Sequence, residues 1–337
     1  MKQTLYRTAS RSRLVRALER AAEKGKSVTV LVELKARFDE AENIQWAARL
    51  ERAGASVVYG VARLKTHAKA CLIVRREADG IRRYAHLGTG NYNESTAKLY
   101  TDHGLLTDDE KLTRDLSSLF NMITGFSKPL GTSKLVVAPL ELRRTLLRLI
   151  QREAQRSTPE QPGRIAAKMN SLVDEDIIEA LYEASRAGVR VRLNVRGTCR
   201  LVPGVPGRSD TIEVVSIVDR FLEHSRIFCF RNGGDDEVYL SSADWMPRNL
   251  DRRVETMFPI EDAKLAREIL DTMKLYFRDN VRSWLLKPDG SYERRDAGDR
   301  EPFRVQEELC RRYEEREARR RRAIPRDLKP RKPESNR

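Results

Sequence analysis

Short strand-like runs alternate along the chain with longer stretches in which apolar residues recur every three or four positions. Residues 28–32 read VTVLV and predict a buried strand, whereas residues 12–24 predict an amphipathic helix that ends at Gly25. The same patterns predict strands at 3–6, 57–59, 70–74 and 82–87 and helices at 39–53, 112–123 and 140–154. Repeated strand–helix–strand order predicts an α/β fold with helices on both faces of the sheet.

Part of this pattern occurs twice. Residues 16–30 align with residues 179–193 at a constant offset of 163 positions, across a helix, a glycine and a strand. Helix–glycine–strand units are common in α/β proteins, so two unrelated copies are the simpler alternative. We favour an internal duplication, which predicts two similar domains related by a pseudo-twofold axis. We place them at residues 1–134 and 135–310, followed by a basic helical or disordered tail at 311–337.

A histidine followed two positions later by a cation precedes a predicted strand in both halves. His67 and Lys69 form the first pair, and His224 and Arg226 form the second. Alternation along a strand would place each pair on one face. A neutral imidazole can attack phosphorus while a nearby cation holds a phosphoryl oxygen. A lone histidine beside a strand is more often structural, but two such pairs among only four histidines favour a catalytic cleft shared by both domains.

Charge and composition narrow the class of ligand. The net charge is +15, and residues 311–337 supply +7 of it through twelve basic and five acidic side chains. The remaining +8 lies on the folded part and is compatible with an acidic ligand such as nucleic acid or phosphate. No CxxC motif marks a zinc site among the four cysteines, and no run of about 18 apolar residues predicts a membrane span. The absence of a signal peptide predicts a cytoplasmic protein.

Further candidates lie at the ends of predicted strands, where α/β folds place their sites. The segment Gly88–Glu94 (GTGNYNE) has glycines, amides and a hydroxyl, but it matches neither a dinucleotide fingerprint nor a Walker loop, and hairpins use the same residues. His86 reads as a polar core residue, and His103 is the least informative histidine. The cations at strand ends are Arg7, Arg37, Lys69 and Arg196.

Several long motifs resemble the catalytic half of the long, histidine-phosphorylated polyphosphate kinases. They include VELKARFDEAENI, LKTHAKACLIVRR, YAHLGTGNYNESTAKLYTDHGLLT, NVRGTC and RFLEHSRIFCF, and the resemblance extends from residue 2 to about 310. It implies two phospholipase D-like domains with mixed sheets. Matched by position, the resemblance implies that His67 is the phosphorylated histidine and that His224 is the second cleft histidine, near the ATP phosphates. It implies that Tyr100 and Arg196 contact ATP, that Arg7 and Arg37 lie at the magnesium–phosphate site, and that His86 has a supporting role in the cleft.

The resemblance also implies an activity, its cofactors and its partners. The expected reaction is reversible transfer of the ATP γ-phosphate to polyphosphate through a phosphohistidine at His67, assisted by His224 and Lys69. Mg²⁺ is the expected cofactor, and ATP, ADP and inorganic polyphosphate are the expected ligands, with nucleic acid disfavoured. The chain resembles a truncated form, which implies a homo-oligomer or a complementing N-terminal half as partner. The implied location is the cytoplasm or the inner face of the membrane.

Two other functions remain open at this point. A phospholipase D-like phosphodiesterase or nuclease would use the same paired histidines, but residues 70–76 lack the carboxylate that the motif of that family places after its lysine. The chain could also be a non-catalytic polyphosphate-binding remnant. A first domain without its opening strand would expose an unpaired sheet edge, so we expect the second domain to be better ordered.

Overall fold

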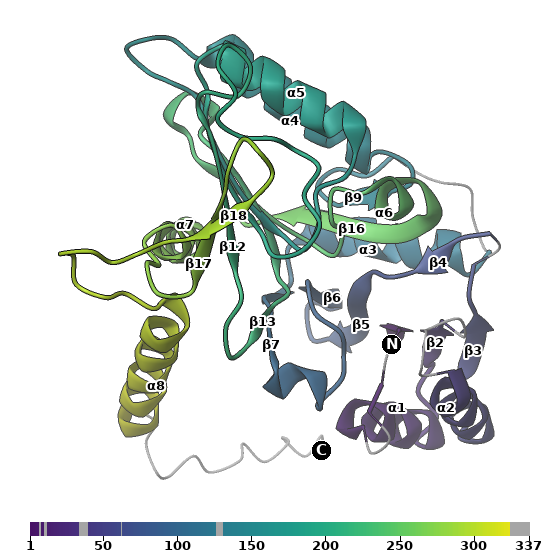
Figure 1. Cartoon of the computed structure of the whole chain (residues 1–337). Coiled ribbons are helices and arrows are strands. Elements are labelled where there is room, and N and C mark those ends of the chain that lie inside the picture. Colours follow the sequence, from purple (N-terminus) through teal and green to yellow (C-terminus); the bar gives the residue numbers. More distant parts are fainter. Residues whose placement is uncertain (7, 10–11, 34–39, 62, 126–130, 324–337) are drawn as a thin grey trace.

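The computed structural model describes residues 1–6, 8–9, 12–33, 40–61, 63–125 and 131–323 (Figure 1). Two mixed β-sheets form its framework, and helices pack on both faces of each sheet. The predicted α/β class is therefore confirmed. Among the described helices, none is long and apolar enough to cross a membrane.

The first sheet contains six strands. Three are parallel to one another, and the other three continue the sheet in antiparallel order. In sheet order they are β3 (Ser56–Tyr59), β2 (Thr29–Val32), β1 (Lys2–Leu5), β5 (Lys69–Glu77), β6 (Gly80–Gly88) and β8 (Gly104–Thr107). Helices α1 (Arg13–Glu23) and α2 (Glu40–Arg52) pack on one face, and α3 (Glu110–Ile123) packs on the other.

Local sequence explains how α1 begins and ends. The Ser12 hydroxyl accepts a hydrogen bond from the Val15 amide at 3.4 Å and so caps the first turn. Val15 and Leu18 then repeat at helical spacing and are buried against the sheet. The helix stops before Gly25, whose φ of +71° lies in the left-handed region that glycine adopts without strain.

The second sheet repeats this arrangement and is longer. In the order in which they lie across the sheet, its strands are β18 (Tyr292–Arg294), β17 (Ser283–Leu286), β12 (Ile212–Ile217), β11 (Arg190–Val195), β10 (Arg164–Met169), β14 (Arg226–Phe230), β15 (Glu237–Ser241), β16 (Arg253–Pro259) and β4 (Lys65–Thr66). The short strand β9 (Val136–Ala138) also pairs with β16. Helices α4 (Leu142–Arg156) and α5 (Glu175–Arg186) cover one face and α7 (Ala263–Tyr276) the other, with α6 (Pro247–Arg252) before β16.

The two sheets share one connectivity, which confirms the predicted duplication. In each, the first strand pairs in parallel with the strand that follows the next helix and in antiparallel with the strand after the histidine. Strands β1, β2 and β3 thus correspond to β10, β11 and β12, and β5 and β6 correspond to β14 and β15. Lys69 opens β5 and Arg226 opens β14, so the two histidine–cation pairs are structurally equivalent.

The two halves also exchange short strands. β4, just before His67, pairs with β16 of the second half. β13 (Leu222–Glu223), just before His224, pairs with β7 (Tyr100–Thr101) of the first half. A continuous apolar core then joins β5, β6 and α3 to the face of the second sheet beneath α7. Each histidine segment is therefore built partly by the opposite half of the chain.

The start and end of the chain differ in how they pack. β1 is paired on both sides, so the unpaired edge expected near the start of the chain does not occur at this strand. The outer strands of the first sheet are β3 and β8.

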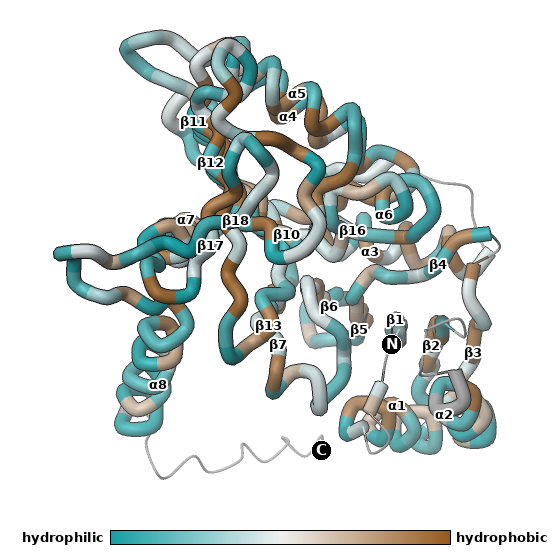
Figure 2. The backbone as a smooth tube through the Cα atoms, viewed as in Figure 1, coloured by the Kyte–Doolittle hydropathy of each residue, from teal (hydrophilic) through white to brown (hydrophobic). Residues whose placement is uncertain are grey.

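At the other end of the chain, helix α8 (Val305–Ala323) is largely hydrophilic along its length (Figure 2). Its first turn is anchored, because Val305 is fully buried and Gln306 is 3% exposed.

Candidate active site

His67 lies between β4 and β5 and is held by the opposite half of the chain. The amides of His67 and Ala68 both donate to the Val254 carbonyl of β16 at 2.9 Å. The next residue of β16, Glu255, brings its Oε2 to 2.9 Å from Nδ1 of His67. The His67 side chain is 9% exposed and Glu255 is fully buried. The first histidine therefore forms a carboxylate–imidazole pair across the junction of the two halves.

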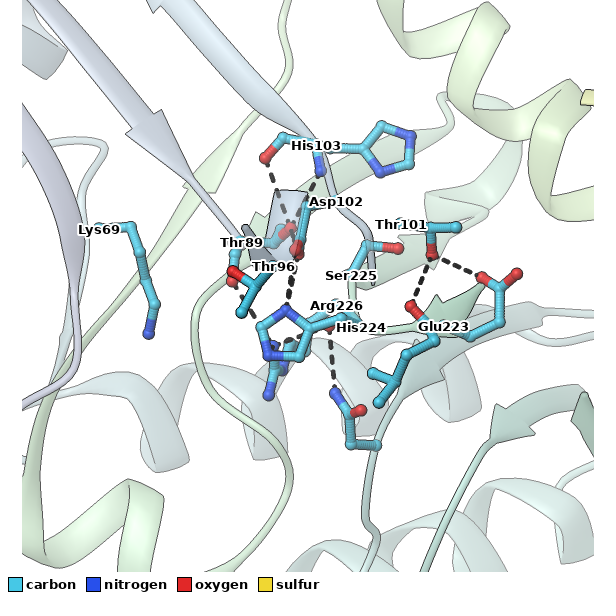
Figure 3. A network of polar contacts seen from close by, with 12 residues as sticks. Lys69, Thr89, Thr96, Thr101, Asp102, His103, Glu223, His224, Ser225 and Arg226 are labelled. Carbon is cyan, nitrogen blue, oxygen red and sulfur yellow. Dashed lines mark hydrogen bonds and ion pairs between the residues drawn. The ribbon is translucent and has the colours of Figure 1, made fainter. Parts of the chain in front are cut away.

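His224 forms the matching pair in the reverse direction. The amides of His224 and Ser225 donate to the Thr101 carbonyl of β7, at 3.2 and 2.9 Å. The residue after this strand, Asp102, places both carboxylate oxygens 2.9 Å from Nδ1 of His224, as Figure 3 shows. The two histidine–carboxylate pairs are thus related by the same pseudo-symmetry as the sheets. In both, the histidine and its carboxylate come from opposite halves.

Arg226 determines the tautomer of His224. Its Nη1 lies 3.1 Å from Nε2 of His224 and 2.7 Å from the His224 carbonyl. A guanidinium only donates hydrogen bonds, so Nε2 of His224 accepts and Nδ1–H donates to Asp102. In contrast, Nε2 of His67 makes no hydrogen bond with any described residue. Of the two histidines, His67 is therefore the one with a ring nitrogen free to attack.

Burial and positive charge keep both histidines neutral. Burial, together with the nearby Lys69 and Arg253 cations, lowers the pKa of His67 well below its usual value. Burial and the Arg226 guanidinium lower the pKa of His224 to about 4. Charge also acts across the junction, since Arg226 lowers the pKa of His67 and Lys69 lowers that of His224. Neutral imidazoles beside two cations suit nucleophilic attack on a phosphoanhydride.

The carboxylates of the site differ in their ionisation. Burial raises the pKa of Glu255 to about 7, against the opposing effect of Lys69. Burial would also raise the pKa of Asp244, but the Arg226 guanidinium outweighs it and lowers that pKa to about 2. Arg226 donates through Nε and Nη2 to the two Asp244 oxygens at 3.1 and 3.0 Å. The buried guanidinium is thus neutralised by Asp244 and still reaches His224.

Lys69 is buried rather than solvent-exposed. Its side chain is 1% exposed, and its ammonium donates to the His67 carbonyl. The same nitrogen lies 5.5 Å from the centre of the Tyr6 ring. Burial lowers the pKa of Lys69 well below its usual value. The ammonium therefore supports the backbone at His67, and its contact with phosphate stays a prediction.

Comparison with known proteins identifies the family. Residues 1–129 match the profile described as polyphosphate kinase C-terminal domain 1, and residues 135–306 match that of polyphosphate kinase C-terminal domain 2. The chain belongs to the polyphosphate kinase family. The resemblance inferred from the motifs is therefore confirmed.

Relatives and a solved structure agree with this family. The chain is 59% identical over 310 residues to a polyphosphate kinase of Rhodopirellula baltica, covering 92% of this chain and 36% of the relative. A polyphosphate kinase of Pseudomonas aeruginosa is 54% identical, with coverage of 92% and 45%. The crystal structure of the Porphyromonas gingivalis polyphosphate kinase superposes with a TM-score of 0.87 at 40% identity, over 94% of this chain and 49% of that one. The chain thus spans less than half the length of these family members.

Two residues that the family resemblance assigns to ATP lie close to His224. The Tyr100 ring centre is 5.2 Å from that of His224. Arg196 donates from Nε and Nη2 to the Asn170 side-chain oxygen at 2.9 and 2.8 Å, and Asn170 donates in turn to the His224 carbonyl at 3.1 Å. Both are therefore connected to the second histidine.

The remaining predicted residues have different outcomes. Arg7 and Arg37 lie outside the described residues. His86 makes no hydrogen bond with His67 or His224. Instead, its Nδ1 lies 2.7 Å from the Tyr92 hydroxyl. It lines a cavity of about 260 Å³ together with Gly90, Tyr100 and Asp102. His86 therefore borders space next to the second histidine–carboxylate pair.

The loop after β6 positions Asp102 rather than showing a phosphate cradle of its own. The Thr89 hydroxyl donates to Asp102 Oδ1 at 2.6 Å. A Cβ atom on Gly90 would lie 2.3 Å from the carboxylate of Asp102, so only glycine allows this approach. The loop accordingly orients the carboxylate that binds His224.

The described residues contain no group of three or more histidine, cysteine, aspartate or glutamate side chains arranged to hold a metal ion. The three carboxylates near the cleft are each occupied by a histidine or by Arg226. This part of the chain thus does not form a Mg²⁺ cage. Enzymes of phosphoryl transfer often bind Mg²⁺ chiefly through the substrate phosphates.

The three carboxylates Asp102, Glu255 and Asp244 are not among the residues predicted from the sequence. Lys168 of β10 is not among them either; its ammonium lies 3.1 Å from Glu223, and both side chains are buried. Asp102 lies in a quoted family motif two residues after Tyr100, so its proximity to a predicted site residue was an available signal. Glu255 and Asp244 are isolated carboxylates in the sequence and carry no such signal.

Proposed function

We propose that this chain forms the phosphoryl-transfer centre of a polyphosphate kinase, with His67 as the nucleophile. Nε2 of His67 attacks the γ-phosphorus of ATP, the N–P bond forms, and the bond to the bridging β,γ-oxygen breaks to release ADP. A terminal polyphosphate oxygen then attacks the phosphohistidine and regenerates His67; the reverse sequence makes ATP. The observation that carries this assignment is the free Nε2 of His67, since Nε2 of His224 accepts from Arg226.

The surrounding side chains support the transfer through orientation and charge. Ionised Glu255 accepts Nδ1–H of His67 and leaves the lone pair on Nε2. Arg226 and Lys69 provide positive potential in a site largely closed to water, where charge on the transferring phosphoryl group is stabilised most strongly. We assign the nucleotide to the His224 side, where Tyr100 and Arg196 lie. Mg²⁺ would accompany the ATP phosphates and reduce their charge.

Direct mapping of the phosphoryl group tests this function. Wild-type protein incubated with γ-labelled ATP and Mg²⁺ should acquire a label that is stable to alkali and labile to acid, as expected of a phosphoramidate. Mass spectrometry after alkaline digestion should place it on the peptide that contains His67. A label on His224 would exclude the proposed assignment, and binding of polyphosphate without any label would indicate a non-catalytic protein.

A phosphodiesterase would use the same cleft with water as the acceptor. Bis-p-nitrophenyl phosphate should therefore be tested in parallel, with and without His67→Ala. Under the proposed function, hydrolysis of this diester should not exceed background while ATP still labels the protein. Diester hydrolysis that depends on His67, without labelling by ATP, would favour the phosphodiesterase.

The pKa of Glu255 predicts a pH dependence of phosphohistidine formation. The ionised carboxylate accepts Nδ1–H and exposes the Nε2 lone pair, whereas the protonated carboxyl donates to Nδ1 and moves the ring proton to Nε2. An acid with a pKa of about 7 becomes ionised as pH rises, so the single-turnover rate should increase about tenfold between pH 6 and 8. Rapid-quench measurement at saturating Mg-ATP would determine this profile.

Glu255→Gln is the matched variant for that profile. Its amide cannot ionise, so the rise near pH 7 should disappear, and the rate at pH 8 should fall about 10²-fold or more. Titration of ATP itself affects both proteins equally and cancels in their ratio. An unchanged inflection in Glu255→Gln would show that another group controls the rate.

Gly90→Ala should displace Asp102 from His224. The new Cβ would lie 2.3 Å from the Asp102 carboxylate, so the side chain must move and His224 loses its oriented acceptor. We expect a decrease of about tenfold or more in the rate of phosphohistidine formation, since small misplacements of catalytic groups are costly. Gly131→Ala is the control, because a Cβ there meets no atom within 4 Å. Equal rates in both variants would contradict the positioning role.

A further inference from the structure

A second cavity lies at the opposite end of the second sheet from His224. It occupies about 590 Å³, a size typical of small-ligand sites. Arg164 and Arg190 open β10 and β11, and Arg231 follows the last residue of β14. The histidine lies before the first residue of β14, so the full length of a strand of about five residues, roughly 15–20 Å, separates the two sites. The cavity is thus distinct from the histidine cleft.

The rim of this cavity has positive charge without protein partners. Arg164, Arg190 and Arg231 line it, and their side chains make no hydrogen bond or ion pair with any described residue. Arg164 and Arg190 are register partners on adjacent parallel strands, so their side chains leave the same face of the sheet. Unpaired guanidinium groups that converge on one cavity are well suited to bind a phosphate group bidentately.

The acidic residues of the cavity do not cancel this charge. Glu213 and Asp236 also line it. Glu213 is already bound by Arg192 at 2.8 Å and by Arg295. Lys274 of α7 also lines the rim, but its ammonium is paired with Asp271 at 2.7 Å. Asp236 makes no hydrogen bond or ion pair with a described residue, so it offsets one of the three unpaired guanidinium groups, and the positive charge that remains favours an anion.

The floor of the cavity is apolar, which distinguishes it from a site for a simple anion. Beneath α7 it is lined by Cys229, Leu270, Met273 and Phe277. The Arg192 guanidinium lies 5.0 Å from the centre of the Phe277 ring. Aromatic and sulfur-containing side chains favour a flat ring, and the guanidinium groups around them favour phosphate. Inorganic polyphosphate has no apolar part and would leave this floor without a function.

We propose that this cavity is a second binding site for a nucleoside phosphate, separate from the histidine cleft. The base occupies the apolar floor beside Met273 and Phe277, and the phosphates contact Arg164, Arg190 and Arg231. The site performs no chemistry, because it contains no nucleophile oriented by a base. A bound nucleotide would instead regulate the second histidine through the second sheet, because strand β14 runs from this cavity to Arg226 and His224. The proposal does not depend on His67 being phosphorylated.

Photolabelling of the whole chain tests the site directly. The probe is 8-azido-ADP, with labelled peptides identified by mass spectrometry in wild type and in the double variant Arg164→Ala/Arg190→Ala. We expect wild-type labelling of the segments 229–231 or 270–277 that ADP suppresses by competition. Loss of two charge-assisted contacts should weaken ADP competition at this site by about a hundredfold. Labelling near Tyr100 should remain unchanged in the variant.

Arg267→Ala is the control, because Arg267 is an exposed arginine of α7 that does not line the cavity. Absence of label from 229–231 and 270–277 in wild type, with label near Tyr100, would overturn the second site alone. Suppression of labelling by inorganic triphosphate as effectively as by ADP would show a general anion site and overturn the nucleoside assignment. Failure of labelling near Tyr100, with labelling at the cavity retained, would instead contradict the nucleotide position proposed for the cleft.

Discussion

Replacement of His67 by alanine is expected to abolish phosphohistidine formation, with a loss of about 10⁴-fold or more in the rate of labelling by ATP. The side chain provides the only nitrogen of the two histidine–carboxylate pairs that has no hydrogen-bond partner among the described residues. No neighbouring group replaces it, because Nε2 of His224 is held by Arg226 and Lys69 donates to a backbone carbonyl. Acid-sensitive label retained after denaturing gel filtration measures the effect.

Two histidine variants serve as controls for this experiment. His86→Ala should retain the label, since His86 contacts Tyr92 rather than either histidine–carboxylate pair. His224→Ala should form phosphohistidine more slowly but on the same His67 peptide. If His224→Ala abolishes the label and His67→Ala does not, the roles of the two histidines must be exchanged.

Arg226→Ala is expected to destabilise the protein by about 3–5 kcal/mol, because it leaves the Asp244 charge buried without its partner. Arg226 is 4% exposed and makes two hydrogen bonds to Asp244. It also donates to the His224 carbonyl, so its loss loosens the segment that carries the second histidine. Urea unfolding monitored by circular dichroism would measure the change in the free energy of unfolding.

A double variant separates the buried charge from the active-site role of Arg226. Arg226→Met/Asp244→Leu removes both charges together and should recover much of the lost stability, as replacement of buried ion pairs by apolar residues often does. Phosphohistidine formation should not recover with it, because the cation near the phosphoryl group remains absent. A single-variant loss below about 1 kcal/mol would show that water reaches Asp244 and compensates its charge.

The site also explains why the two halves of the chain must fold together. Val254 binds the backbone at His67, and Thr101 binds the backbone at His224. The carboxylate that orients each histidine is the next residue in the chain, Glu255 after Val254 and Asp102 after Thr101. Neither half alone contains a complete histidine–carboxylate pair, so the junction between the halves creates the site.

The amino-acid sequence by itself determined most strands and helices of the first half and the internal duplication. Residues 28–32 contain the predicted strand, and α1 ends before Gly25 as its pattern indicates, because apolar periodicity and chain termination signals act within a few residues. The same local reasoning identified His67 and His224, since the histidine–cation spacing lies within three residues and repeats in both halves. These features require no knowledge of which distant segments meet.

Only the tertiary structure decided which histidine keeps a ring nitrogen without a hydrogen-bond partner among the described residues. Glu255 is 188 positions from His67, and Asp102 is 122 positions from His224, so no local pattern connects them. The exchange of β4 and β13 between the halves brings these partners together. The tautomer of an imidazole depends on the donor or acceptor at each nitrogen, and the neutral state depends on burial and on cations from both halves. These are properties of atoms a few ångströms apart in space, and chain folding alone places them there.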